Sequence, residues 1–211
     1  MSVYIIASTK SWHDRLVINL QNQFVSDTFI RFKDSCDLIP ERLNELDPKY
    51  IFFPHWSWII PDTIFKSFPC VIFHMTDLPY GRGGSPLQNL IIRGHKNTMI
   101  TALKCAEGID AGPIYAKKPL RLHGSANEIF IRSSHIIEKM IADIITKNPE
   151  PIPQKGDIVS FKRRTPEQSE MQGEESVENV YNFIRMLDAD EYPHANFHYD
   201  GFEYTFTKAI K

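Results

Sequence analysis

The spacing of hydrophobic residues alternates between two periods along the first part of the chain. Short runs rich in β-branched and aromatic residues predict strands at Val3–Ala7, Thr28–Phe32, Tyr50–Phe53 and Cys70–His74. Longer stretches of helical period lie between them and predict helices at Ser11–Phe24, Pro40–Leu46 and Pro61–Phe68. Strands that alternate with helices in this way predict an α/β fold, with a Rossmann-like, open and mostly parallel sheet flanked by helices.

The pattern continues after a loop at Met75–Gly84. A helix is expected at Pro86–Arg93, followed by two strands at Thr98–Lys104 and Pro113–Leu122. Ser125 and Glu128 have the spacing of a capping box, which predicts that the longest helix begins at Ala126 and runs to Lys147.

The C-terminal part of the chain is predicted to contain shorter helices and strands and more connecting segments. Residues 149–155 and 165–176 are expected on the surface, with a short strand at Ile158–Phe161 between them. A helix at Val177–Leu187 and a β-hairpin around Asp200-Gly201 should follow. We therefore expect a main domain over residues 1–160 and a small appendage of helix plus hairpin over residues 161–211.

Composition narrows the possible functions. The 211 residues carry 24 Lys and Arg against 26 Asp and Glu, so the net charge of -2 provides no general attraction for nucleic acid. No apolar run approaches the roughly 18 residues that a membrane span requires, and the N-terminus has no signal-peptide pattern, so a cytoplasmic protein without membrane contact is expected. The cysteines Cys36, Cys70 and Cys105 are too far apart to suggest a metal site.

The candidate chemistry lies where strands end. His74 closes a buried strand, and open α/β sheets bind ligands in the crevice beyond their strand ends. The loop after Lys104 carries Glu107 and Asp110, either of which is a possible partner for the imidazole. The alternatives are structural: a histidine bonded to backbone, and an aspartate that stabilises a turn between glycines.

Several segments resemble the folate-dependent formyltransferases. The run His74-Met75-Thr76-Asp77-Leu78-Pro79-Tyr80-Gly81-Arg82-Gly83-Gly84-Ser85-Pro86-Leu87-Gln88 is similar to the His, Leu-Pro, Arg-Gly, Pro and Gln segment of that family. Residues 107–114 resemble its acidic loop, which contributes the catalytic aspartate, and residues 98–101 resemble the strand that leads into that loop. Residues 161–167 resemble a downstream segment of aromatic, basic, Pro and acidic residues. Residues 180–187 with Tyr192-Pro193 look like an element near the end of the sugar-modifying members.

This resemblance implies an enzyme that moves a formyl group from 10-formyltetrahydrofolate onto an amine without a metal. It implies that His74 and Asp110 are catalytic. The residues expected to contact the folate are Leu78, Pro79, Arg82, Gly83 and Glu107, although Arg82 is also suited to holding the loop. Those expected to contact the acceptor are Thr76, Arg163 and Arg164. Glycines 81, 83 and 84 are expected to allow close approach of the pterin ring.

One position departs from the family. An Asn that helps to hold the formyl oxygen usually stands two residues before the catalytic histidine, and here that position is Ile72. Isoleucine donates no hydrogen bond, so a donor is missing or supplied from elsewhere. His55 is the candidate replacement, with Ser57 and Thr76 behind it; the alternative is a structural polar residue among aromatics.

The acceptor is expected to be a nucleotide-linked amino sugar rather than a nucleic acid. The tail at Tyr192-Pro193 and aromatic residues able to stack on a base favour that acceptor. A catalytically impaired folate or nucleotide-sugar binding protein remains open, as do methionyl-tRNA and glycinamide ribonucleotide as acceptors. The elements over residues 177–207 are a possible homodimer interface.

Overall fold

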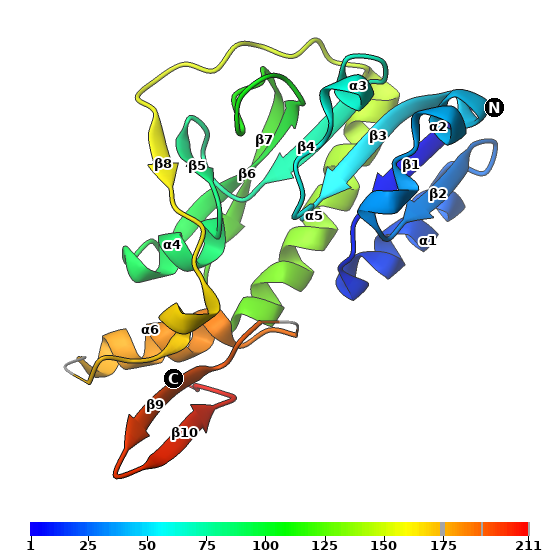
Figure 1. Ribbon diagram of the computed structural model, residues 1–211. Helices are drawn as coiled ribbons and strands as arrows, with labels where there is room; N and C mark the ends of the chain where they lie inside the picture. Colours follow the sequence, from blue (N-terminus) through cyan, green and yellow to red (C-terminus); the bar gives the residue numbers. More distant parts are fainter. Residues whose placement is uncertain (174–175, 191, 211) are drawn as a thin grey trace.

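A six-stranded sheet forms the centre of the computed structural model, which describes residues 1–173, 176–190 and 192–210 (Figure 1). Its strand order is β2-β1-β3-β4-β6-β7. The first four are β1 (Val3–Ala7), β2 (Thr28–Phe32), β3 (Pro48–Pro54) and β4 (Cys70–His74), and neighbours among them pair in parallel. Strand β6 (Asn97–Lys104) runs antiparallel to both β4 and β7 (Ile114–Arg121). The expected α/β class with a mostly parallel sheet is confirmed.

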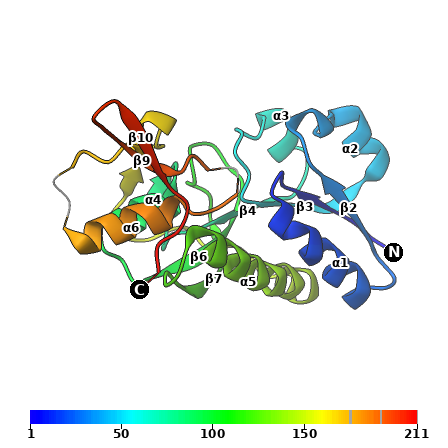
Figure 2. The ribbon, with the colours of Figure 1, turned by 90° about the horizontal axis from the view of Figure 1, so that it is seen from below.

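Helices cover both faces of this sheet (Figure 2). Helices α1 (Asp14–Gln23) and α5 (Ala126–Lys147) lie on one face, and α2 (Pro40–Leu46) and α3 (Asp62–Phe65) lie on the other. A 3-10 turn, η1 (Ser11–His13), precedes α1, so the first part of the predicted helix is wound more tightly than expected. Helix α4 (Pro86–Ile92) connects the region after β4 to β6.

The alternation of side chains along the strands explains the two layers of core. In β1, Tyr4 and Ile6 join the core under α1 and α5, whereas Ile5 and Ala7 join the core under α2 and α3. Strands β3 and β4 alternate in the same way. A strand that is buried on both faces reads as a continuous apolar run, which is why the sequence identified these strands well.

Helix α5 begins and ends as its sequence predicts. The Ser125 hydroxyl accepts from the Glu128 amide while the Glu128 carboxylate accepts from the Ser125 amide. Asn148 closes the helix in the left-handed conformation, with φ of 44°. These caps satisfy backbone groups that a helix otherwise leaves without partners.

A second, two-stranded sheet lies beside the first. Strand β5 (Tyr80–Gly83) pairs in parallel with β8 (Val159–Phe161), although the sequence predicted only a loop over residues 75–84. The expectation missed β5 because glycine and arginine replace the alternating apolar residues that normally mark a strand. The pairing places a segment from late in the chain against the loop that follows His74.

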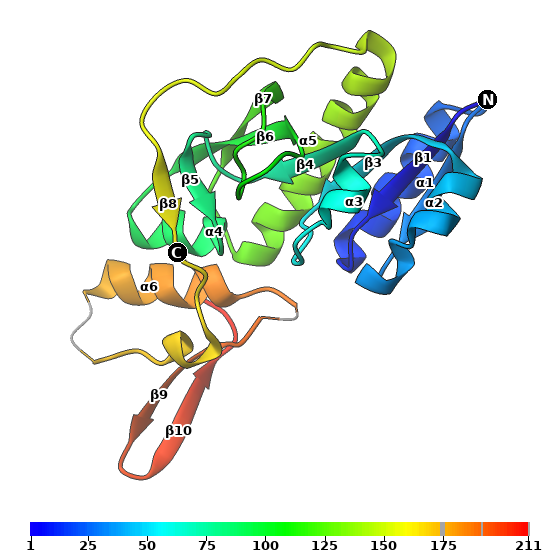
Figure 3. The same cartoon turned by 45° about the horizontal axis from the view of Figure 1, so that its top comes forward.

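The chain ends in helix α6 (Val177–Leu187) and a hairpin of β9 (Ala195–Tyr199) and β10 (Phe202–Phe206), preceded by the short turn η3 (Pro166–Ser169). Figure 3 shows α6 beside α4 while the hairpin extends away from the central sheet. Ile184, Met186 and Leu187 of α6 belong to the same core as α5. Within the residues that the structure describes, no helix has the length and apolar character needed to cross a membrane.

Candidate active site

His74 lies at the carboxyl end of β4 and is buried, with 7% of its surface exposed. Its Nε2 lies 2.7 Å from the Gly81 carbonyl oxygen. A carbonyl oxygen only accepts hydrogen bonds, so Nε2 carries the hydrogen. Nδ1 is therefore the ring atom that can gain or lose a proton.

Asp110 reaches His74 by an indirect route. Because β6 is antiparallel to β4, Lys104 at its end pairs with Val71 and not with His74. The loop after β6 consequently folds back along the sheet, and this places Asp110 Oδ2 at 3.5 Å from His74 Nδ1. Of the two carboxylates that the sequence left open as partners, the structure brings Asp110 to the imidazole, whereas Glu107 lies near Lys66.

Asp110 is held at several points. Its backbone adopts a φ of 50°, which is uncommon for a residue other than glycine. Oδ2 accepts the Gly83 amide at 2.9 Å, and the Asp110 carbonyl accepts from Gln154 Nε2 at 2.7 Å. Gln154 Oε1 in turn accepts two hydrogen bonds from the Arg82 guanidinium, at 3.2 and 2.8 Å. Gln154 thus clamps the acidic loop to β5.

The glycines of the loop after His74 serve packing within the protein. A Cβ on Gly83 would lie 2.4 Å from the Phe161 carbonyl oxygen, and one on Gly84 would lie 2.4 Å from Arg163 Cβ. One on Gly81 would meet Thr76 at 2.7 Å. Phe161, Arg163 and Thr76 fill the space where these Cβ atoms would stand, so the approach of a pterin ring stays a prediction for the other faces of the loop.

Some of the remaining residues expected at the site are buried, and others are exposed or half-buried. Thr76 and Leu78 are 0% exposed, and the Thr76 hydroxyl donates to the Gly81 carbonyl at 3.3 Å, so both residues shape the loop from inside. Pro79 follows Leu78 through a cis peptide bond and is buried. Glu107 is exposed and lies 3.8 Å from Lys66 of the segment after α3.

The two arginines lie beyond β8. Arg163 Nη2 donates to the Ser57 carbonyl at 3.3 Å and so connects this segment to the loop after β3. The amide of Arg164 donates to Ser85 Oγ at 3.0 Å, and its guanidinium packs over the Phe183 ring at 5.5 Å. Arg163 is exposed and Arg164 is half-buried.

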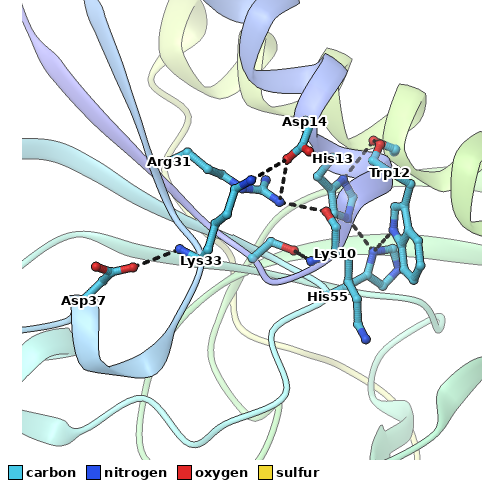
Figure 4. A network of polar contacts seen from close by, with 10 residues as sticks. Lys10, Trp12, His13, Asp14, Arg31, Lys33, Asp37 and His55 are labelled. Carbon is cyan, nitrogen blue, oxygen red and sulfur yellow. Dashed lines mark hydrogen bonds and ion pairs between the residues drawn. The ribbon is translucent and has the colours of Figure 1, made fainter. Parts of the chain in front are cut away.

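His55 follows β3 and belongs to a polar network (Figure 4). Its Nδ1 lies 2.7 Å from His13 Nε2 and 3.4 Å from the indole Nε1 of Trp12. His13 Nδ1 lies 2.8 Å from the Ser134 hydroxyl on α5. The Nε2 of His55 lies 2.9 Å from the sulfur of Met75, the residue after His74. The network thus connects η1 and α5 to the end of β4.

Both imidazoles of this network are held neutral. Burial, reinforced by the charges of Lys10 and His74, lowers the pKa of His55 to about 3. Burial also lowers the pKa of His13 well below its usual range, with His55 and Arg31 adding to the effect. Each ring therefore carries one hydrogen near neutral pH.

The sequence did not predict Gln154, His13, Trp12 and Ser134 as parts of this site. Gln154 lies in a segment expected to be only a connection, and Trp12 lies in a segment expected to be part of a helix. His13 and Ser134 are 121 residues apart, so no local pattern joins them. The one feature of the sequence that could have pointed to this network was His13, a histidine near the start of a predicted helix.

Comparison with known proteins identifies the family. The family model described as formyl transferase matches residues 30–129, and that described as methionyl-tRNA formyltransferase, C-terminal domain, matches residues 166–211. A solved structure of methionyl-tRNA formyltransferase from Clostridium thermocellum is 46% identical, with a TM-score of 0.97, over 100% of this chain and 94% of that one. The chain belongs to the formyl transferase family.

Other relatives of this formyl transferase are more distant. Methionyl-tRNA formyltransferase of Halalkalibacterium halodurans is 30% identical over 74% of this chain and 52% of that protein. A sugar N-formyltransferase from Shewanella shares the fold with a TM-score of 0.73 at 17% identity, over 100% of both chains. The chain spans about half the length of the curated relatives that it matches.

Proposed function

We propose that this protein transfers a formyl group from 10-formyltetrahydrofolate to the amine of a nucleotide-linked amino sugar. The observation that carries the proposal is the pairing of His74 Nδ1 with the Asp110 carboxylate, 3.5 Å apart, at the edge of the sheet. An imidazole nitrogen beside a carboxylate is an arrangement suited to proton transfer.

His74, Asp110 and the Gly81 carbonyl have different roles in the proposed reaction. The acceptor nitrogen attacks the formyl carbon, and the electron pair of the carbonyl bond moves to its oxygen. His74 Nδ1 takes the proton that the attacking nitrogen loses, and the Asp110 carboxylate stabilises the resulting imidazolium. The bond from carbon to the folate nitrogen then breaks, and that nitrogen receives the proton from His74. The Gly81 carbonyl keeps the ring oriented because it accepts from Nε2.

The surroundings suit a flat heteroaromatic donor. The loop after β3 exposes Trp58 and Ile59, and the loop that carries Asp110 exposes Ile109. The buried indole Nε1 of Trp56, in the same loop as Trp58, has no hydrogen-bond partner. An apolar surface with an unpaired donor beneath it fits the pterin of a folate, which offers ring faces and polar edges.

Two observations favour a sugar nucleotide as acceptor. The net charge of -2 gives no general attraction for an acceptor stem. Arg163 is exposed near the loop after β3 and is suited to a pyrophosphate.

Methionyl-tRNA is the second candidate, because the Clostridium thermocellum structure that matches the entire chain at 46% identity carries that name. A transfer assay separates the two. The protein is incubated with 10-formyltetrahydrofolate and either UDP- and dTDP-linked amino sugars or charged initiator tRNA, and the product mass is read.

We expect a gain of one formyl group on an amino sugar and none on the tRNA. We expect Asp110→Asn and His74→Asn each to reduce kcat by about 100-fold or more. Formylation of the tRNA alone would replace the proposed acceptor, and turnover unchanged in both variants would refute the proposed chemistry.

A further inference from the structure

Cys70 and Cys105 lie opposite each other on neighbouring strands. Cys70 begins β4, and Cys105 is the first residue after β6. These strands are antiparallel, and Val71 lies opposite Lys104. The next pair along the register is therefore Cys70 and Cys105, and the Cys105 amide donates to the Cys70 carbonyl at 2.9 Å. Both residues are free thiols that the proposed reaction does not use.

The spacing of such a pair suits a disulfide bond. Residues directly opposite each other in an antiparallel pair have Cα atoms about 4.5–5.5 Å apart, and disulfide-bonded cysteines have Cα atoms about 4.4–6.8 Å apart. Opposite side chains also point to the same face of the sheet. Cys70 and Cys105 both belong to the core under α2 and α3, where they are 2% and 8% exposed. The register of β4 and β6 thus places the two thiols within the range that a disulfide bridges.

The pair lies at the base of the loop that carries Asp110. Cys105 is the first residue of this loop, which follows β6. The other end of the loop packs against the same place, because a Cβ on Gly112 would lie 1.8 Å from the Lys104 carbonyl oxygen. A displacement of Cys105 is therefore transmitted to both ends of the loop.

Burial keeps both thiols protonated. It raises the pKa of Cys70, and the neighbouring Cys105 adds to the effect. It also raises the pKa of Cys105 to about 11, and the charge of Asp110 contributes. A protonated thiol is a poor nucleophile, so the pair reacts slowly at neutral pH. A raised pKa also removes the stabilisation that a thiolate gives to the reduced form, so a disulfide is favoured once it has formed.

We propose that Cys70 and Cys105 are a modification site, at which a small-molecule disulfide introduces a reversible cross-strand disulfide bond that slows formyl transfer. Cys105, the more exposed of the two, attacks the small-molecule disulfide as its thiolate and releases one thiol. The Cys70 sulfur then attacks the Cys105 sulfur of the mixed disulfide and releases the second thiol. The two protons lost by the cysteines go to the released thiols, and the oxidant takes up the two electrons.

The bond acts on catalysis through the position of the loop. Cβ atoms of opposite residues are about 4.5–5.5 Å apart, and those of a disulfide are about 3.5–4.5 Å apart, so the bond draws Cys105 toward β4 by about 1 Å. Asp110 lies 3.5 Å from His74, and a displacement of about 1 Å at such a pair costs up to about 100-fold in rate. This effect rests on the proposed function, whereas the disulfide itself does not.

The test uses Cys36→Ser protein, because the exposed Cys36 would otherwise form mixed disulfides. The protein is incubated with oxidised glutathione at about pH 8.5, where more of each buried thiol is ionised than at pH 7. Peptide mapping by mass spectrometry then identifies the bonds, and kcat is measured before oxidation, after it, and after reduction with dithiothreitol. The matched controls carry Cys70→Ala or Cys105→Ala in addition.

We expect one peptide pair joined through Cys70 and Cys105, a fall in kcat of about 10- to 100-fold, and reversal of both by dithiothreitol. In each control the same treatment should change kcat by less than about twofold. Two thiols that stay reduced, or that are capped by glutathione without a bond between them, would overturn the modification site. A disulfide that leaves kcat unchanged would overturn its effect on transfer. If no amine is formylated at all, the proposed function fails while the peptide map still decides the disulfide.

Discussion

Single residues in this site are fixed by backbone geometry as much as by their side chains. His55 and Asp110, from separate loops, both have a φ of 50°. Gly83 has a φ of 108° and donates its amide to Asp110 Oδ2. The sequence showed these residue types, but it did not show that the glycine is required by the Phe161 carbonyl above it.

Substitution of Gly83 tests that requirement. Gly83→Ala should lower the free energy of unfolding by about 2–4 kcal/mol, because an unfavourable φ is combined with a clash against backbone. Gly94→Ala is the control: Gly94 also has a positive φ, 75°, but a Cβ there meets nothing within 4 Å. It should cost only about 1–2 kcal/mol. Urea denaturation measures both, and equal losses would show that the close contact with β8 is unimportant.

At the scale of elements, the periodicity of the sequence identified the strands and helices of the central sheet, because burial on both faces leaves an unmistakable apolar run. It did not give the direction of β6, since a strand reads alike in either direction. It also missed β5, whose pairing with β8 depends on glycines that allow close approach. The position of Asp110 depends on both of these features.

The segment between α5 and β8 holds the acidic loop against β5 through Gln154, and a Gln154 variant tests this role. Gln154→Ala removes the hydrogen bonds to the Asp110 and Gly112 carbonyls and releases Arg82. We expect a loss of about 10- to 100-fold in kcat, because Asp110 is no longer held against His74. Amide exchange in residues 105–113 should accelerate. The neighbouring exposed Lys155→Ala should alter neither, and a similar effect of both variants would argue against the clamp.

The stability of the whole molecule depends on pH because the folded protein keeps His13 and His55 neutral. His55 and His13 have folded-state pKa values below their usual 6.5, in the first case about 3. The unfolded chain therefore binds more protons than the folded one at mildly acidic pH. The sign follows: their contribution to stability is complete above pH 6.5 and is lost as the pH falls from 6.5 towards 3.

Unfolding in urea at pH 7 and 5.5 measures this loss. We expect the free energy of unfolding to fall with a slope that approaches about 1.4 kcal/mol per pH unit for each buried neutral histidine. His55→Asn should reduce the slope, because Asn does not titrate. His123→Asn, at a position exposed to solvent, is the control and should keep the wild-type slope. A pH-independent stability in this range would contradict the burial of neutral rings.

The clamp by Gln154 also has a consequence for the order in which the protein is made. Gln154 bonds to the carbonyl of Asp110, 44 residues earlier in the chain. A nascent chain therefore contains Arg82 and Asp110 well before Gln154, which joins them, has been synthesised. Domains fold largely as units during synthesis. We expect the acidic loop to be fixed against β5 only late in synthesis, so that a product truncated before residue 154 transfers the formyl group more slowly.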